Sequence, residues 1–96
     1  MTDKQTYSWI FFSIALGSQK EAIGYNDISN LADGINHAVP TDNEMRKSIN
    51  WLISENLISK TGKKYQLTDL GKDIYKSVEV NNKSTLNTWK ELENKI

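Results

Sequence analysis

Residues 56–71 read NLISKTGKKYQLTDLG, and this stretch predicts two short strands around a basic turn, followed directly by a helix. The segments 57–59 and 65–67 are rich in residues that favour strands, and Thr61 and Gly62 supply the turn between them. The hydroxyl of Thr68 can then cap a helix whose first residue is acidic, which the positive end of a helix favours. We therefore expect an antiparallel pair that leads into a helix.

The segment before this stretch, residues 41–56, predicts a well-defined helix. Pro40 ends the preceding helix, and Thr41 forms a capping box with Glu44, in which each side chain accepts a hydrogen bond from a free backbone N–H of the other. The face that should pack into the core carries Met45, Ile49, Leu52 and Ile53. The opposite face carries polar side chains and one tryptophan.

The helix, the basic turn between two strands and the Leu-Thr-Asp-Leu-Gly segment after them resemble the winged helix-turn-helix superfamily. MarR-like and PadR-like regulators carry a similar Leu-Thr-x-x-Gly segment after the wing, and the resemblance covers about residues 7–80. It implies a mainly α fold with a small antiparallel β-wing, in the order helix, strand, helix, helix, strand, wing, strand, helix, helix. Such domains usually bind duplex DNA with their third helix in the major groove, although some bind proteins.

The N-terminal half predicts a helix, a short strand and a second helix. Residues 6–17 form the first helix, whose apolar residues are too dense for one narrow stripe, so it should be buried on more than one side. Residues 22–24 form a small strand that pairs with the wing, and Asn26 caps a helix over residues 27–36. The residues that this second helix should bury are Ile28, Leu31, Ala32 and Ile35.

The C-terminal part predicts two more helices, over residues 69–80 and 84–96, separated by a polar break at residues 81–83. The first of them places Leu70, Ile74 and Val78 on one face, and Ser84 caps the second. The apolar stripe of the last helix consists of Leu86, Trp89, Leu92 and Ile96. We expect this stripe to pack against the first helix of the same chain, with the seam of a homodimer as the alternative.

Length and composition limit the possible functions. Ninety-six residues allow one domain, 1–96, with its core within about residues 6–80 and a C-terminal helix from about residue 84. The absence of cysteine excludes disulfides and sulfur-ligated zinc, and it suits a reducing cytoplasm. The longest apolar stretch, residues 9–16, is far shorter than the about 20 residues that span a membrane, so we expect a soluble cytoplasmic protein.

No group of residues predicts catalysis or cofactor binding. His37 is the single histidine, it lies in a turn, and no serine or carboxylate is paired with it by spacing. One histidine with scattered acids does not make a metal site, and the scattered glycines do not form a phosphate-binding loop. We therefore expect neither an enzyme nor a metal or cofactor site.

The charge is balanced overall, with 12 basic and 12 acidic residues, whereas a DNA-binding domain normally carries a basic surplus. Its distribution is uneven, because residues 21–44 contain acidic side chains but no lysine or arginine. Residues 45–64 reverse this pattern, with a single glutamate against Arg46, Lys47, Lys60, Lys63 and Lys64. The basic charge thus falls on the third helix and the wing.

The candidates for DNA contact on the third helix and the wing are Asn43, Arg46, Lys47, Asn50, Lys60, Lys63 and Lys64. Asparagine can pair with adenine and arginine with guanine, and lysine can reach guanine or phosphate. The wing lysines can also hold phosphates beside a groove in any sequence. The same residue types are common on solvated surfaces, so a plain polar surface is the alternative.

Trp51 is expected to be exposed on the same face of the third helix, where a large aromatic side chain often contacts a protein partner. The alternative places it under the first or the last helix. Two functions follow from these patterns. One is a DNA-binding protein, by resemblance a small transcriptional regulator, and the other is a winged-helix protein-interaction module that does not bind DNA.

Overall fold

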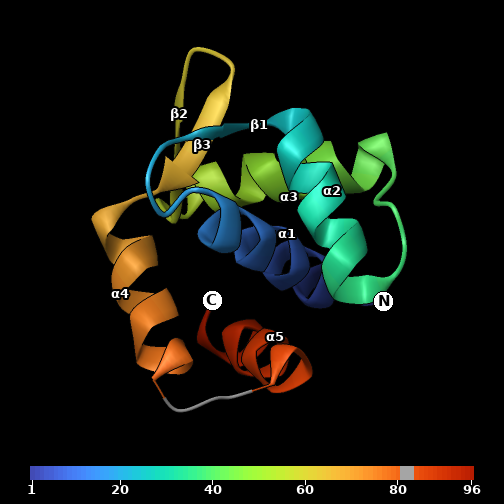
Figure 1. The fold of residues 1–96 in the computed structure, drawn as a ribbon, viewed down its shortest axis with the longest axis vertical. Helices are drawn as coiled ribbons and strands as arrows, with labels where there is room; N and C mark the ends of the chain where they lie inside the picture. Colours follow the sequence, from blue (N-terminus) through green and yellow to red (C-terminus); the bar gives the residue numbers. More distant parts are fainter. Residues whose placement is uncertain (81–83) are drawn as a thin grey trace.

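The computed structural model describes residues 1–80 and 84–96 and is mainly helical, with a small three-stranded antiparallel sheet. In chain order its elements are α1 Asp3–Gly17, β1 Ile23–Gly24, α2 Tyr25–Asn36, α3 Asp42–Ser54, β2 Ile58–Thr61, β3 Lys64–Leu67, α4 Asp69–Glu79 and α5 Thr85–Lys95 (Figure 1). This is the order expected from the sequence. The polar break expected at residues 81–83 lies outside the described residues. None of the helices in the described ranges has the length and apolar character needed to cross a membrane.

The central element is α1, and α2, α3 and α5 pack against it (Figure 1). Every residue from 6 to 15 is buried, as the density of apolar residues predicts. The helix begins earlier than expected because Thr2 and Gln5 form a capping box. The Gln5 N–H donates to Thr2 Oγ1 at 3.1 Å, and the Thr2 N–H donates to Gln5 Oε1 at 2.7 Å.

The sheet has the strand order β1-β3-β2, and the expected antiparallel pair is confirmed. In the β2–β3 hairpin Ile58 pairs with Leu67, and the two-residue turn consists of Gly62 and Lys63. Gly62 has a φ of 63°, which glycine adopts without steric cost at the first position of such a turn. On the other side of β3, the short strand β1 pairs as expected. The hairpin projects beyond the helices (Figure 1).

The segment after the hairpin folds as its sequence predicts. Thr68 caps α4, because its Oγ1 accepts a hydrogen bond from the Gly71 N–H at 3.1 Å. The same hydroxyl donates to the Asn56 carbonyl at 2.6 Å, which connects the start of α4 to the turn between α3 and β2. Gly71 lies so close to Leu57 that a Cβ at this position would overlap with the Leu57 carbonyl oxygen. The Thr-x-x-Gly spacing therefore fixes how α4 crosses the chain that enters the hairpin.

The start of α2 differs from the sequence-based prediction. Gly24, rather than Asn26, is the N-cap, since β1 ends there in an extended conformation with φ −87° and ψ 175°. The Gly24 N–H donates to the Asp27 carboxylate at 3.3 Å, so the helix starts two residues before position 27, at Tyr25. Along α2 the buried apolar residues are, as expected, Ile28, Ala32 and Ile35, with Leu31 half-buried.

The core face of α3 is rotated slightly from the prediction. Met45, Ile49 and Leu52 are buried as expected, but Ile53 is 39% exposed, and its place in the core is taken by Ser48, which is fully buried. Positions 45, 48, 49 and 52 follow the i, i+3, i+4, i+7 spacing of a stripe that faces one neighbour, here α1. Ile53 lies at the edge of this stripe.

The expected packing of α5 against α1 within the same chain is present. Trp89 Nε1 donates to Ser8 Oγ at 2.9 Å, and Leu92 is fully buried. Two expected core residues are instead exposed, Leu70 by 47% and Leu86 by 68%. Both helices turn a different face to the core than expected. The buried positions are Gly71, Tyr75 and Val78 in α4 and Thr88 and Leu92 in α5, and Leu70 and Leu86 lie outside these faces.

Candidate nucleic-acid interface

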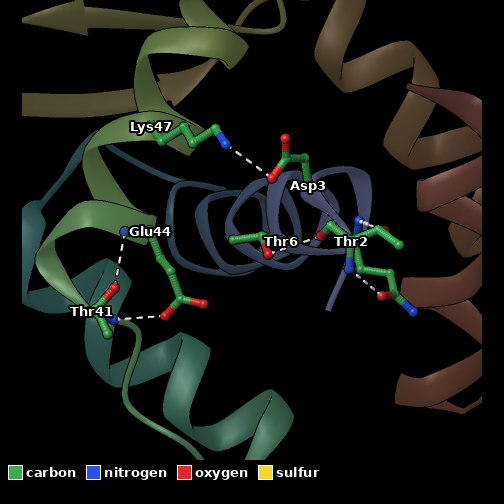
Figure 2. Close-up of polar contacts among 7 residues, drawn as sticks. Thr2, Asp3, Thr6, Thr41, Glu44 and Lys47 are labelled. Atoms are coloured by element: carbon green, nitrogen blue, oxygen red, sulfur yellow. Dashed lines mark hydrogen bonds and ion pairs between the residues drawn. The ribbon is translucent and has the colours of Figure 1, made fainter.

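The buried stripe of α3 packs into the core, so the opposite, polar face of this helix is exposed. Asn43, Arg46, Lys47 and Asn50 are all exposed on it. The helix starts at the expected capping box, in which the Thr41 N–H donates to Glu44 Oε1 at 2.9 Å and the Glu44 N–H donates to Thr41 Oγ1 at 3.1 Å (Figure 2). These bonds hold the first turn of α3 in place, and with it the first residues of the polar face.

The hairpin carries the three lysines predicted to contact phosphate, Lys60, Lys63 and Lys64, and all three are exposed. The Lys60 ammonium lies 5.8 Å from the centroid of the Tyr65 ring, within the range of a cation–π contact. Lys60 and Tyr65 are directly opposite each other on β2 and β3, so the contact runs across the hairpin.

A hollow of about 300 Å³ joins the polar face of α3 to the hairpin. Arg46 and Asn50 line it from α3, and Tyr65 lines it from β3. Its remaining wall is formed by Tyr25 at the start of α2, Asp42 and Ile49. The structure thus brings two of the predicted residues, Arg46 and Asn50, beside the strand that carries Lys64. Asn43 and Lys47 lie outside the hollow.

Sequence reasoning did not assign a role to the residues that hold Arg46. Its Nε donates to one carboxylate oxygen of Asp42 at 2.8 Å, and the Tyr25 hydroxyl donates to the other at 2.7 Å. The Tyr25 hydrogen bond and the neighbouring guanidinium lower the pKa of Asp42, and the same carboxylate raises the pKa of Tyr25. The i, i+4 spacing of Asp42 and Arg46 was a usable signal, whereas nothing in the sequence pointed to Tyr25.

Lys47 is also held by a carboxylate. Its Nζ lies 3.0 Å from Asp3 Oδ1, in the first turn of α1, and this contact raises the pKa of the lysine (Figure 2). Both side chains are more than half exposed. The two residues are 44 positions apart, so no local pattern predicts the pair.

Trp51 is not substantially exposed, contrary to the prediction. It is half-buried, and its ring stacks on that of Tyr7 in α1, with the centroids 4.5 Å apart and the planes 10° from parallel. The alternative, in which Trp51 lies against the first helix, therefore describes the structure. Helical phase alone failed here because α1, which packs on the buried stripe of α3, also reaches Trp51 at the side of that stripe.

A second hollow, of about 340 Å³, lies away from these residues, between the end of α1 and one face of α4. Tyr75 forms part of its wall. Burial, together with a hydrogen bond to Glu79, raises the pKa of the Tyr75 hydroxyl to about 12. None of the residues predicted to contact DNA lines this hollow.

The described residues contain no group of three or more histidine, cysteine or acidic side chains placed to hold a metal ion. His37 is a turn residue, as expected. It has a left-handed φ of 54° at the end of α2, and its N–H donates to the Asp33 carbonyl at 2.7 Å.

Comparison of the chain with protein-family models, with curated proteins and with solved structures gives no match in any of the three.

Proposed function

We propose that this chain is a small winged helix-turn-helix protein that binds duplex DNA and acts as a transcriptional regulator in the cytoplasm. The observation that carries the proposal is the hollow that Arg46 and Asn50 of α3 share with Tyr65 of the β2–β3 hairpin, whose three lysines are exposed. A helix with exposed asparagine and arginine next to a basic hairpin offers base contacts and phosphate contacts on one side of the molecule.

In this proposal α3 lies in the major groove. Asn43 and Asn50 face base edges, and Asn50 lines the hollow, while Arg46 and Lys47 face the backbone phosphates. The hairpin is the wing, and its three exposed lysines hold phosphates beside the groove. The surface has no proposed catalytic group.

The direct test is a titration of the protein with a generic DNA duplex at low ionic strength, followed by fluorescence anisotropy. We expect binding through about three to five phosphate contacts, and a plot of log affinity against log salt that falls by about 0.9 per contact. Absence of binding even at low salt would contradict the proposal. So would binding that survives the combined loss of Arg46, Lys47, Lys63 and Lys64.

A protein-interaction module of the same fold is the second candidate. Two observations favour it: the net charge is zero, and both basic side chains on the polar face of α3 are already paired with carboxylates. The half-buried Trp51, which stacks on the buried Tyr7, would then contribute its exposed part to the contact surface. The partner would be another protein or a second copy of the chain. Sedimentation over a range of concentrations distinguishes self-association from a monomer.

A further inference from the structure

Both basic side chains on the polar face of α3 are held by carboxylates of the same chain. Arg46 binds Asp42 at 2.8 Å, and Lys47 binds Asp3 at 3.0 Å. All four side chains are more than half exposed, so neither pair is needed to neutralise a buried charge. The pairs instead engage Arg46 and Lys47, the two cations of α3 that would bind DNA phosphates.

The contacts of Asp42 resemble those that a phosphate would make in the same place. Its two oxygens accept from two donors on different elements, the Arg46 guanidinium and the Tyr25 hydroxyl, and all three residues line the hollow between α3 and the hairpin. Arginine and tyrosine are common donors to DNA phosphates. The carboxylate thus engages donors that could otherwise bind a backbone phosphate.

Asp3 acts on Lys47 from a different direction. It lies in the first turn of α1 and draws the Lys47 ammonium toward α1 (Figure 2). A lysine held in this way has to leave its partner before it can reach a phosphate. The two acids come from separate elements, and each engages one cation.

We propose that Asp42 and Asp3 compete with DNA phosphates for Arg46 and Lys47 and thereby lower the affinity of the protein for DNA of any sequence. This inference rests on the proposed DNA-binding function. Base contacts made by Asn43 and Asn50 are not weakened in the same way, because their side-chain amides carry no charge and both side chains are exposed. Binding then depends more strongly on the base contacts, and the ratio of specific to non-specific affinity rises.

Exposed ion pairs are weak, so the acids should reduce binding rather than abolish it. The test compares the wild type with Asp42→Asn and Asp3→Asn in titrations with a generic duplex at low ionic strength. Each variant should bind about three- to fivefold more tightly, and the double variant should gain roughly the product of the two. The matched control is Glu55→Gln, which removes an exposed acid at the other end of α3 and should give a smaller gain.

A double-mutant cycle separates competition from simple repulsion between acid and DNA. In an Arg46→Ala background, Asp42→Asn should improve binding no more than Glu55→Gln does, because the cation it releases is gone. The same holds for Asp3→Asn in a Lys47→Ala background. Without DNA, NMR should show a shifted Arg46 Nε–H signal in Asp42→Asn and a lowered pKa of Lys47 in Asp3→Asn.

The outcomes are distinct. If the wild type binds DNA but neither acid variant binds more tightly, or if the gain persists in the alanine backgrounds, the competition is overturned and the DNA-binding function remains. If no variant binds at low salt, the proposed function and this inference both fail. Melting curves confirm folding, which should be preserved because the Thr41–Glu44 capping box does not involve Asp42.

Discussion

Single residues determine how the hairpin is joined to the helices. At Gly71 the backbone of α4 approaches the carbonyl of Leu57, the residue before β2, and only glycine leaves enough space. At Thr68 one hydroxyl caps α4 and also binds the carbonyl of Asn56. These contacts connect the end of α3, the hairpin and α4, so the position of the basic hairpin relative to α3 depends on them.

Substitution of Gly71 by alanine should therefore destabilise the fold. The added methyl group would meet backbone atoms rather than a movable side chain, and we expect the free energy of unfolding to fall by about 1–3 kcal/mol. Gly34→Ala is the control, because Gly34 lies within α2 with no atom near its Cβ position, and alanine should stabilise it by about 0.5–1 kcal/mol. Urea denaturation of both variants checks this. Equal stability of the two would be inconsistent with the overlap at Gly71.

Tyr75 should make the stability depend on alkaline pH. Its pKa rises from the ordinary 10.0 to about 12 in the folded protein, so folding favours the neutral phenol. The resulting stabilisation is complete below pH 10 and is lost as the pH rises to about 12. Tyr75→Phe should lose less stability than the wild type over this interval, measured by urea denaturation at several pH values. Identical slopes would mean that Tyr75 does not titrate in this way.

At the scale of elements, the parts predicted well were those determined by local signals. The hairpin and the start of α3 follow from turn and capping residues that lie next to each other in the sequence. The errors concern tertiary packing. Ile53 and Trp51 were placed by helical phase alone, but α1 sets which side of α3 is covered, so Ile53 is exposed and Trp51 stacks on Tyr7.

In the candidate site, too, the sequence predicts local features but not contacts between elements. Arg46 and Asn50 could be placed on one exposed face from their spacing, and whether they contact DNA stays a prediction. Tyr25, beside Arg46, and Asp3, the partner of Lys47, could not be identified, because both come from other helices that only the fold brings close to α3.

The contact between α5 and α1 gives a prediction at the same scale. Leu92 is fully buried, so Leu92→Ala should reduce the free energy of unfolding by about 2–5 kcal/mol. Leu86→Ala on the same helix should have little effect, since Leu86 is 68% exposed. Thermal unfolding of the two variants tests the comparison. If Leu86→Ala were the more damaging change, α5 would not be packed as described.

On the scale of the whole molecule, the basic hairpin and α5 lie at opposite ends (Figure 1). A chain with zero net charge can still bind a polyanion if its basic side chains are concentrated on one side. The proposed interface holds five of the 12 basic residues, as three exposed lysines on the hairpin and exposed Arg46 and Lys47 on α3. The position of a lysine, rather than the total charge, should therefore determine its effect on DNA binding.

The last prediction compares two pairs of lysines that contribute the same charge. Replacing Lys63 and Lys64 of the hairpin by alanine should reduce the slope of log affinity against log salt by about two units, because two phosphate contacts are lost. Replacing Lys90 and Lys95, which are exposed on α5, should leave the slope nearly unchanged. Anisotropy titrations of both double variants at several salt concentrations measure these slopes. Equal reductions would mean that only net charge matters, and the hairpin would then have no specific part in binding DNA.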